Sequence, residues 1–267
     1  MQPIMIHETA IIEKGAELDD SVEIGAYAII SKATRIGAGC KISAHAQLCG
    51  KVELGPGNHI GRAAIIGGDP QDLTFDTTLE SGVRIGSGND LREHVTIHRS
   101  ASGGGWTSIG NDNFLMTGSH VGHDVIIGHQ NVIANNCLLA GHVSIDNHTF
   151  LGGGSGFHQF IHIGELSMTQ GNSSISKDIP PYCIASQLNR LVGLNVVGLR
   201  RAGMDAETRA EIKRAYRATF RSRLPLAQAL EEIQDEPWGS PARHFLRALA
   251  NPGRKGVCFH RPGRDGL

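Results

Sequence analysis

The stretch IGNDNFLMTGSHVGHDVIIGHQNVIANNCLLAGHVSI (residues 109–145) has an apolar residue at every sixth position, from Ile109 to Ile145. The same spacing extends, with two breaks, over residues 6–175. Neither the 3.6-residue period of an α-helix nor the two-residue period of a strand gives this pattern. A fixed repeat of six is typical of a parallel β-helix. The sequence therefore predicts a mainly β fold in which each hexapeptide forms one short strand and a corner, and three hexapeptides close a triangular coil of about 18 residues.

The length of the repeat region sets the size of the prism, and its breaks predict loops. Roughly eight coils at about 4.8 Å each give a prism roughly 40 Å long. Ile66 and Ile85 lie 19 residues apart, and Gly103 occupies an apolar position between Ile97 and Ile109. We expect loops near 67–84 and 98–108 to leave the prism, and long loops on a rigid scaffold commonly carry function. Parallel crossovers are normally right-handed; the expected left hand rests on resemblance to known three-sided hexapeptide prisms.

Composition indicates two domains and a reducing environment. The 267 residues have room for a prism over residues 1–186 and a small helical domain over 187–267. The five cysteines are odd in number and lack CxxC spacing, which favours a cytoplasmic location over a disulfide framework or a zinc knuckle. The N-terminus lacks a signal-peptide pattern. No apolar run approaches the length of a membrane span, so we expect no stable membrane insertion.

The C-terminal region is predicted to be helical, and it is rich in basic residues. Asp205 is a candidate N-cap for an amphipathic helix, and residues 226–233 and 241–249 predict two more helices. Residues 254–267 are expected to be frayed. Residues 1–186 hold 10 Lys and Arg against 18 Asp and Glu, whereas residues 187–267 hold 15 against 8. A basic tail is typical of proteins that bind nucleic acid, anionic lipid or an acidic protein. The alternative is an ordinary solvated helix surface.

Histidines provide the candidate chemistry. The chain has 14 of them, and nine lie between His94 and His162. Three explanations compete: scattered surface histidines, a zinc site of three histidines between subunits, and acid–base catalysis, because imidazole titrates near neutrality.

The 18-residue coil predicts which residues stack in adjacent coils. It places His123 beneath Gly141 and Gln159, with His142 and His158 one position to either side of that column. A base beside a free N–H group is the arrangement that acyl transfer needs, because its tetrahedral intermediate develops an oxyanion. Asp124 directly follows His123 and is placed to orient its ring.

Several motifs together resemble one family over almost the whole chain. They are TIHR (96–99), the GGG loop, SHVGHD (119–124), ANN…LAGHVSI, FHQF (157–160), DIPPY, and GLNVVGLRRAG before the helical tail. The chain resembles the O-acyltransferases that move an R-3-hydroxyacyl group from acyl carrier protein to UDP-N-acetylglucosamine, the first step of lipid A synthesis. The resemblance implies a cytoplasmic homotrimer that uses no metal or cofactor. Its partner would be the acidic acyl carrier protein, bound through the basic C-terminal domain, and not nucleic acid.

The resemblance also implies a role for each matching position. His123 is expected to be the general base, Asp124 its partner, and the Gly141 amide the oxyanion donor. The expected substrate contacts are Gln71 and Asp72 for the acyl substrate, His120, His142, His158 and Gln159 in the cleft, Asn195 and Arg201 near the nucleotide and carrier arm, and Gly171 at the floor of the acyl groove.

Three positions depart from the family pattern. Thr74 stands where a lysine is usual, Val197 where an acidic residue is usual, and Ala202 where a second arginine is usual. These departures leave open an acceptor with a 3-amino group. The alternatives are the sister N-acyltransferase of the same pathway, a zinc prism of the carbonic anhydrase kind, and a non-catalytic trimeric rod. The sister family normally carries an extra N-terminal domain before its prism, whereas the repeat here begins at Ile6.

Overall fold

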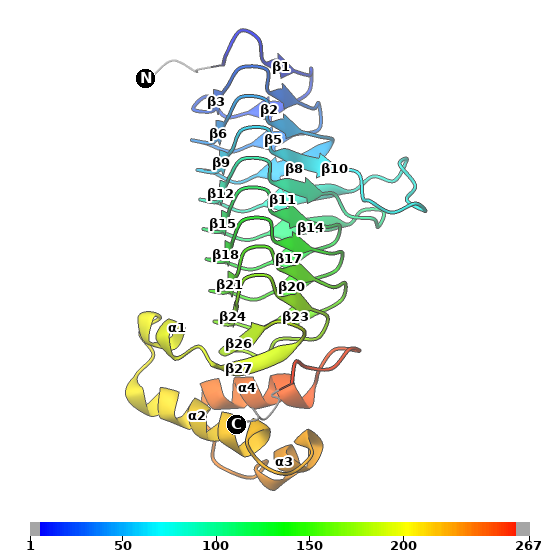
Figure 1. Ribbon diagram of the computed structural model, residues 1–267. Helices are drawn as coiled ribbons and strands as arrows, with labels where there is room; N and C mark the ends of the chain where they lie inside the picture. Colours follow the sequence, from blue (N-terminus) through cyan, green and yellow to red (C-terminus); the bar gives the residue numbers. More distant parts are fainter. Residues whose placement is uncertain (1–5, 260–267) are drawn as a thin grey trace.

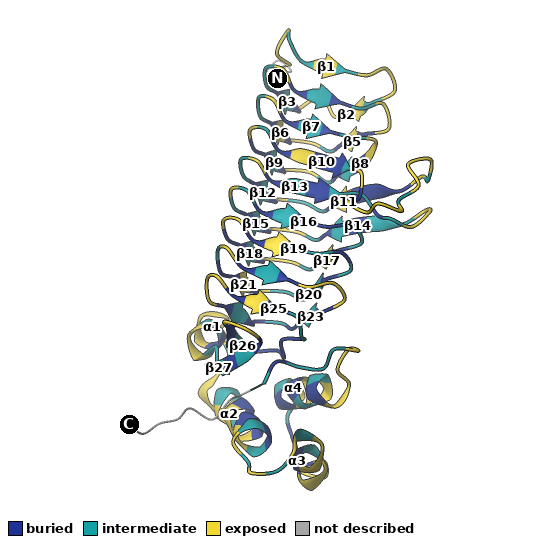
Figure 2. Ribbon diagram, turned by 45° about the vertical axis from the view of Figure 1, so that its right-hand side comes forward, coloured by how far each residue is buried: buried dark blue, intermediate teal, exposed yellow. Residues whose placement is uncertain are grey.

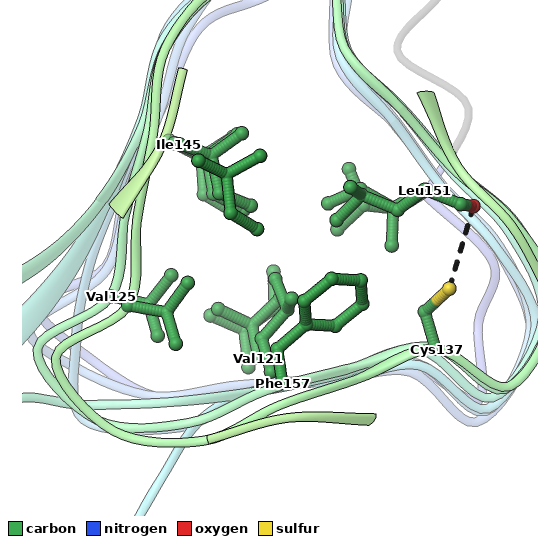
Figure 3. Packing of buried hydrophobic residues seen from close by; sticks show 14 of the residues in the cluster. Val121, Val125, Cys137, Ile145, Leu151 and Phe157 are labelled. Atoms are coloured by element: carbon green, nitrogen blue, oxygen red, sulfur yellow. Dashed lines mark hydrogen bonds between the residues drawn. The ribbon is translucent and has the colours of Figure 1, made fainter. Parts of the chain in front are cut away.

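In the computed structural model, which describes residues 6–259, the repeat region forms a three-sided prism of stacked coils (Figure 1). Each coil contributes one short strand to each of three parallel sheets. The view along the axis shows the chain running from Ile145 through Leu151 to Phe157 clockwise while it approaches the viewer, which is the sense of a left-handed coil (Figure 3). The expected left-handed parallel β-helix is therefore confirmed.

The first sheet has nine strands, which are β1 (Ile11–Ile12), β4 (Ile29–Ile30), β7 (Gln47–Leu48), β10 (Ile65–Gly68), β13 (Thr96–His98), β16 (His120–Val121), β19 (Leu138–Leu139), β22 (Gly156–Phe157) and β25 (Ser174–Ile175). The second has eight, which are β2 (Glu17–Leu18), β5 (Arg35–Ile36), β8 (Lys51–Leu54), β11 (Gly82–Ile85), β14 (Trp106–Ile109), β17 (Ile126–Ile127), β20 (Ser144–Ile145) and β23 (His162–Ile163).

The third sheet has ten strands, which are β3 (Glu23–Ile24), β6 (Lys41–Ile42), β9 (His59–Ile60), β12 (Asp90–Leu91), β15 (Phe114–Leu115), β18 (Val132–Ile133), β21 (Phe150–Leu151), β24 (Met168–Thr169), β26 (Cys183–Ser186) and β27 (Arg190–Leu194). The last of them, β27, pairs antiparallel with β26. This sheet therefore continues to Leu194, and a division of the chain into domains after residue 186 stays a prediction.

The apolar repeat fills the interior of the prism. Successive coils stack the same position of the repeat, as in the column of Val121, Leu139 and Phe157. All three are almost fully buried. Figure 2 shows buried and exposed residues alternating along the rod, with exposed residues at the corners and on some strands. Burial of each such side chain contributes about 1.5–3 kcal/mol before conformational entropy is counted.

Both predicted interruptions leave the prism as loops, and the first is accompanied by a register irregularity between Ile66 and Gly68. Ile66 pairs with Leu48, 18 residues earlier, but with Ile97, 31 residues later. Ile85 pairs with Ile109, 24 residues later. The extra residues form the loops 69–81 and 99–105, which project side by side from the middle of the rod (Figure 1). Because the coil that follows each loop resumes in phase, the loops are additions to a rigid scaffold.

Four helices cover the C-terminal end of the prism, namely α1 (Val196–Arg201), α2 (Ala206–Phe220), α3 (Leu226–Glu232) and α4 (Ser240–Ala250). The predicted N-cap is confirmed, because Asp205 Oδ1 accepts a hydrogen bond from Thr208 N at 2.7 Å. The short helix α1 was not predicted. None of the helices in residues 6–259 is long and apolar enough to cross a bilayer.

The expectation of a frayed C-terminus is wrong for residues 254–259. Val257 and Phe259 form parallel bridges with Asp178 and Arg190, and Cys258 is fully buried. The backbone of this segment forms hydrogen bonds with the open end of the prism. Their favourable free energy outweighs the conformational entropy that the segment loses when it is ordered. Residues 260–267, the rest of the expected frayed tail, lie outside the described residues.

Candidate active site

His123 and Asp124 form a hydrogen-bonded pair at the corner that follows β16. The Nδ1 atom of His123 lies 2.8 Å from Asp124 Oδ2, and the two side chains are only 14% and 13% exposed. Asp124 has a φ of 60°, in the left-handed region that the corner requires. This turn folds the carboxylate back toward the ring of its neighbour, so the expected partnership of the two residues is present in the geometry.

The second loop holds the Asp124 carboxylate in place. The Ser100 hydroxyl donates to Oδ1, and the Ala101 amide donates to Oδ2 at 3.0 Å. Burial raises the pKa of Asp124, but the hydrogen bonds from Ser100, His123 and Ala101 outweigh it and hold the pKa below its ordinary value. Asp124 is therefore an anion whose carboxylate holds the His123 ring in one orientation.

Gly141 lies directly against the His123 ring, as the 18-residue stacking predicts. A Cβ atom at this position would lie 2.5 Å from His123 Nε2, so only glycine fits. In the part of the chain that the structure describes, no group accepts a hydrogen bond from the Gly141 amide. An N–H group that lacks an acceptor and lies beside an imidazole nitrogen can donate a hydrogen bond to an oxygen of a bound substrate on which negative charge develops.

A cleft of about 640 Å³ opens along the first sheet beside this corner. The predicted residues that line it are Gln71, His120, His123, Gly141, His158 and Gln159. Burial, with a contribution from the charge of His98, lowers the pKa of His120 to about 4. The imidazole of His120 is therefore neutral at pH 7. Its Nδ1 atom lies 2.8 Å from the Thr96 hydroxyl, which leaves Nε2 for a ligand.

His142 supports the pair from the side and does not line this cleft. Its ring meets the His123 ring edge to face, with centroids 5.1 Å apart, and stacks on Phe160 at 4.5 Å. Its Nε2 atom lies 3.8 Å from Asp124 Oδ2. His142 and Phe160 border a separate cavity of about 350 Å³ that α4 covers.

Arg99 anchors the first loop, which carries Gln71 and Asp72. Its guanidinium donates to Asp69 Oδ1 at 2.8 Å and to the Thr77 carbonyl at 3.1 Å. Asp72 points back into its own loop, where the amide and hydroxyl of Thr74 donate to its carboxylate and lower its pKa. The loop therefore places Gln71 in the cleft and leaves Asp72 at its edge, with Thr74 fixing the carboxylate.

Three predicted residues lie away from the His123 corner of the same chain. Gly171 is exposed at a different edge of the prism. Asn195 caps α1 through Gly198 N, and Arg201 lies exposed at the end of that helix. The two remaining departures, Val197 and Ala202, also belong to α1 and its C-cap. One chain alone does not bring these residues to the cleft.

A metal site of three histidines does not form in residues 6–259. The group whose ligand atoms lie within 4.8 Å of one another is His123, Asp124 and His142. Both oxygens of Asp124 already accept hydrogen bonds, from Ser100 on one side and from Ala101 and His123 on the other. This donor set is that of an oriented acid–base pair.

Sequence reasoning missed Ser100, His98 and Lys255. Ser100 reaches Asp124 through a loop whose path the repeat does not determine. His98 lines the cleft and packs edge to face on His120, with ring centroids 5.0 Å apart. The TIHR motif at residues 96–99, which contains His98, could have identified it as a candidate. Lys255 lies in the segment expected to be frayed, and its Nζ atom is 2.5 Å from His158 Nδ1.

A prism of hexapeptide coils with a His–Asp pair at one corner defines the class of hexapeptide-repeat transferases. The model of the bacterial transferase hexapeptide (six repeats) matches residues 107–141. The model of UDP-N-acetylglucosamine O-acyltransferase, domain 2, matches residues 178–258.

Full-length relatives define the family. The acyl-[acyl-carrier-protein]–UDP-N-acetylglucosamine O-acyltransferase of Anaeromyxobacter dehalogenans is 41% identical over 94% of this chain and 98% of its own. That of Paraburkholderia phymatum is 46% identical over 86% and 88%. The structure of the Francisella novicida UDP-N-acetylglucosamine acyltransferase superposes with a TM-score of 0.91 at 33% identity, covering 97% and 95%. The chain belongs to the family of acyl-[acyl-carrier-protein]–UDP-N-acetylglucosamine O-acyltransferases.

Proposed function

We propose that this protein transfers an R-3-hydroxyacyl chain from acyl carrier protein to the glucosamine 3-hydroxyl of UDP-N-acetylglucosamine, the first step of lipid A synthesis. The observation that carries the proposal is the oriented His123–Asp124 pair beside the Gly141 amide, in a chain of this family. The alternatives, N-acylation of a 3-amino sugar nucleotide, a zinc prism and a non-catalytic rod, have no comparable support.

The proposed mechanism is general-base catalysis. Nε2 of His123 takes the proton of the sugar 3-hydroxyl while the oxygen attacks the thioester carbonyl. The carbonyl oxygen becomes an oxyanion that accepts a hydrogen bond from Gly141 N–H. Asp124 stabilises the imidazolium through its hydrogen bond to Nδ1. The intermediate then collapses, the C–S bond breaks, and His123 returns the proton to the departing thiolate.

The cleft residues are proposed to bind the two substrates. His120, His158 and Gln159 would contact the sugar, the pyrophosphate or the thioester arm, since all three line the cleft. Gln71 and Asp72 would hold the acyl substrate from the first loop. His142 would act mainly through Asp124, which it faces at 3.8 Å.

A homotrimer with sites between neighbouring prisms is proposed to complete the machinery. Gly171, Asn195 and Arg201 lie away from the His123 corner of their own chain, which supports a site that draws on two subunits. Threefold closure suits a three-sided rod. In such a site Gly171 would form the floor of the acyl groove, and its lack of a side chain favours a longer hydroxyacyl chain.

The charge asymmetry supports acyl carrier protein as the partner. Residues 187–267 hold 15 Lys and Arg against 8 Asp and Glu, and opposite charge accelerates encounter with an acidic protein. A cytoplasmic location fits this partner and the five cysteines, which are all free. We propose neither nucleic-acid binding nor stable membrane insertion.

Mass spectrometry of the product tests the proposal. The protein is incubated with 3-hydroxyacyl carrier proteins and either UDP-N-acetylglucosamine or its 3-amino analogue. The expected product is the 3-O-ester of the first acceptor. An amide formed only with the 3-amino acceptor would overturn the acceptor assignment, and no product from either would overturn the proposed transfer.

A further inference from the structure

The C-terminal segment, residues 253–259, is fixed to the end of the prism beside the active-site cleft. Gly253 N donates to Asp178 Oδ2 at 2.7 Å, and Cys258 N donates to the Asp178 carbonyl at 2.8 Å. Phe259 N donates to the Asn189 carbonyl at 3.0 Å. These bonds enclose residues 254 and 255 on both sides, so the backbone that carries Arg254 and Lys255 has a defined place.

Lys255 reaches a residue of the cleft. Its Nζ atom lies 2.5 Å from Nδ1 and 3.4 Å from Nε2 of His158, which lines the cleft. Lys177 donates to the Lys255 carbonyl at 3.0 Å. Arg254 lies over the Phe160 ring, 5.8 Å from its centroid. Lys255 therefore places an ammonium group at the rim of the cleft, and Lys177 and Arg254 lie beside it, Arg254 on the side of the separate cavity that Phe160 borders.

No acidic side chain forms an ion pair with this rim within residues 6–259. No carboxylate forms an ion pair with Lys177, Arg254 or Lys255 there. The Asp178 carboxylate is occupied by backbone amides, since Oδ1 accepts from His162 N and Oδ2 from Gly253 N. The cleft lining itself contains no Lys or Arg. Within the described residues, Lys255 is therefore a cation next to the cleft that no ion pair occupies.

We propose that Lys255, with Lys177 and Arg254 beside it, binds a phosphate group of a substrate at the rim of the cleft. The inference rests on the proposed function, in which both substrates carry phosphate: the acceptor as a pyrophosphate, the donor as the phosphodiester of the carrier arm. An ammonium group has three N–H donors, and one bond to His158 leaves two for phosphate oxygens. The contact to His158 fixes the ammonium where the ligand enters.

The test compares Lys255→Ala with the full-length wild-type enzyme. Calorimetry measures the Kd of UDP-N-acetylglucosamine, and steady-state kinetics measure KM for each substrate. We expect a Kd or KM that rises about tenfold for one substrate, the usual effect of one charge-assisted bond, and a kcat that changes less than about twofold. Lys255→Arg should restore most of the affinity. Lys14→Ala, an exposed lysine at the other end of the prism, is the matched control.

This experiment distinguishes the two sources of phosphate. A rise in Kd and KM for the sugar nucleotide assigns the rim to the pyrophosphate. A rise in KM for the acyl carrier protein alone assigns it to the arm, and acyl-phosphopantetheine should then lose its advantage over acyl-pantetheine in Lys255→Ala.

Unchanged values for both substrates, within about twofold, would overturn the inference while wild-type transfer stays intact. Absence of wild-type transfer is the separate failure of the proposed function. Lys255→Gln, which keeps an unbranched polar side chain without its charge, provides the same comparison if Lys255→Ala disturbs the C-terminal segment.

Discussion

Gly141 has no room for a side chain unless its neighbour moves, because the His123 ring occupies the space that a Cβ atom would take. In Gly141→Ala the new methyl group would meet Nε2 at 2.5 Å, displace the ring and crowd the amide. We expect the rate of acyl transfer to fall on the order of a hundredfold, since small displacements of reacting groups have effects of that size.

Gly103→Ala is the matched control for this change. Its Cβ would meet only Leu79, at an ordinary 3.5 Å. Transfer rates and thermal unfolding of the two variants check the prediction. Gly141→Ala with wild-type turnover would mean that the ring has room to move and that the amide is not needed.

Ser100 acts through Asp124, and its removal should appear in the pH profile. Without the Ser100 hydroxyl, the carboxylate loses a hydrogen bond that lowers its pKa, so the pKa of Asp124 rises. Protonation of Asp124 then begins at higher pH, and activity disappears earlier as the pH falls. For Ser100→Ala we expect the acid limb of kcat/KM to move to higher pH, with about tenfold lower kcat at neutral pH.

Ser102→Ala controls for the substitution itself, because the Ser102 side chain is exposed. The measurement is kcat/KM against pH for both variants. An acid limb at the wild-type position in Ser100→Ala would show that the hydroxyl does not influence Asp124.

At the scale of elements, a ladder of buried amides stabilises one corner of the prism. Asn89 Nδ2 donates to Asn58 Oδ1, and Asn113 Nδ2 donates to Asn89 Oδ1, each at 2.9 Å. Asn113 Oδ1 in turn accepts a hydrogen bond from the backbone N–H of Asn131. The side-chain Oδ1 of Asn131 accepts one from the backbone N–H of Thr149. Each side chain thus satisfies the backbone of the next coil, which ties coils together along the axis.

Asn113→Ala should destabilise the prism by about 2–4 kcal/mol. It leaves the buried Asn131 amide without its acceptor and the Gly128 carbonyl without a donor. Asn135→Ala, at an exposed position near the next corner, should change stability by less than about 0.5 kcal/mol. Denaturant unfolding of both variants checks this. Equal stability of the two would mean that the ladder contributes nothing beyond solvent hydrogen bonding.

The repeat predicted most of the fold because its period encodes the geometry directly. A residue such as Leu139 at the sixth position must point inward, and the coil length then places Gly141 on His123. The route of residues 99–105 follows from turns and hydrogen bonds that have no period, so the support of Asp124 by Ser100 was not predictable. The ordered segment at residues 254–259 was missed for a similar reason, since it binds mainly through its backbone.

At the scale of the whole molecule, the proposed trimer makes a prediction about mixed assemblies. His123→Ala and Arg201→Ala are each expected to lower activity at least tenfold as homotrimers. If a site takes His123 from one subunit and Arg201 from its neighbour, random mixed trimers rebuild about a quarter of the sites. Co-expression and assay of the mixture check this. Mixtures no more active than their parents would place both residues in the site of one chain.

The most direct measurement is the rate of acyl transfer by His123→Ala, with a 3-hydroxyacyl carrier protein and UDP-N-acetylglucosamine. The ring lines the cleft and serves the proposed chemistry, so the variant should assemble and unfold like the wild type. We predict that its turnover falls by about 10²–10⁴-fold, the usual contribution of a general base. Turnover within about tenfold of the wild type would contradict the assignment of His123 as the base.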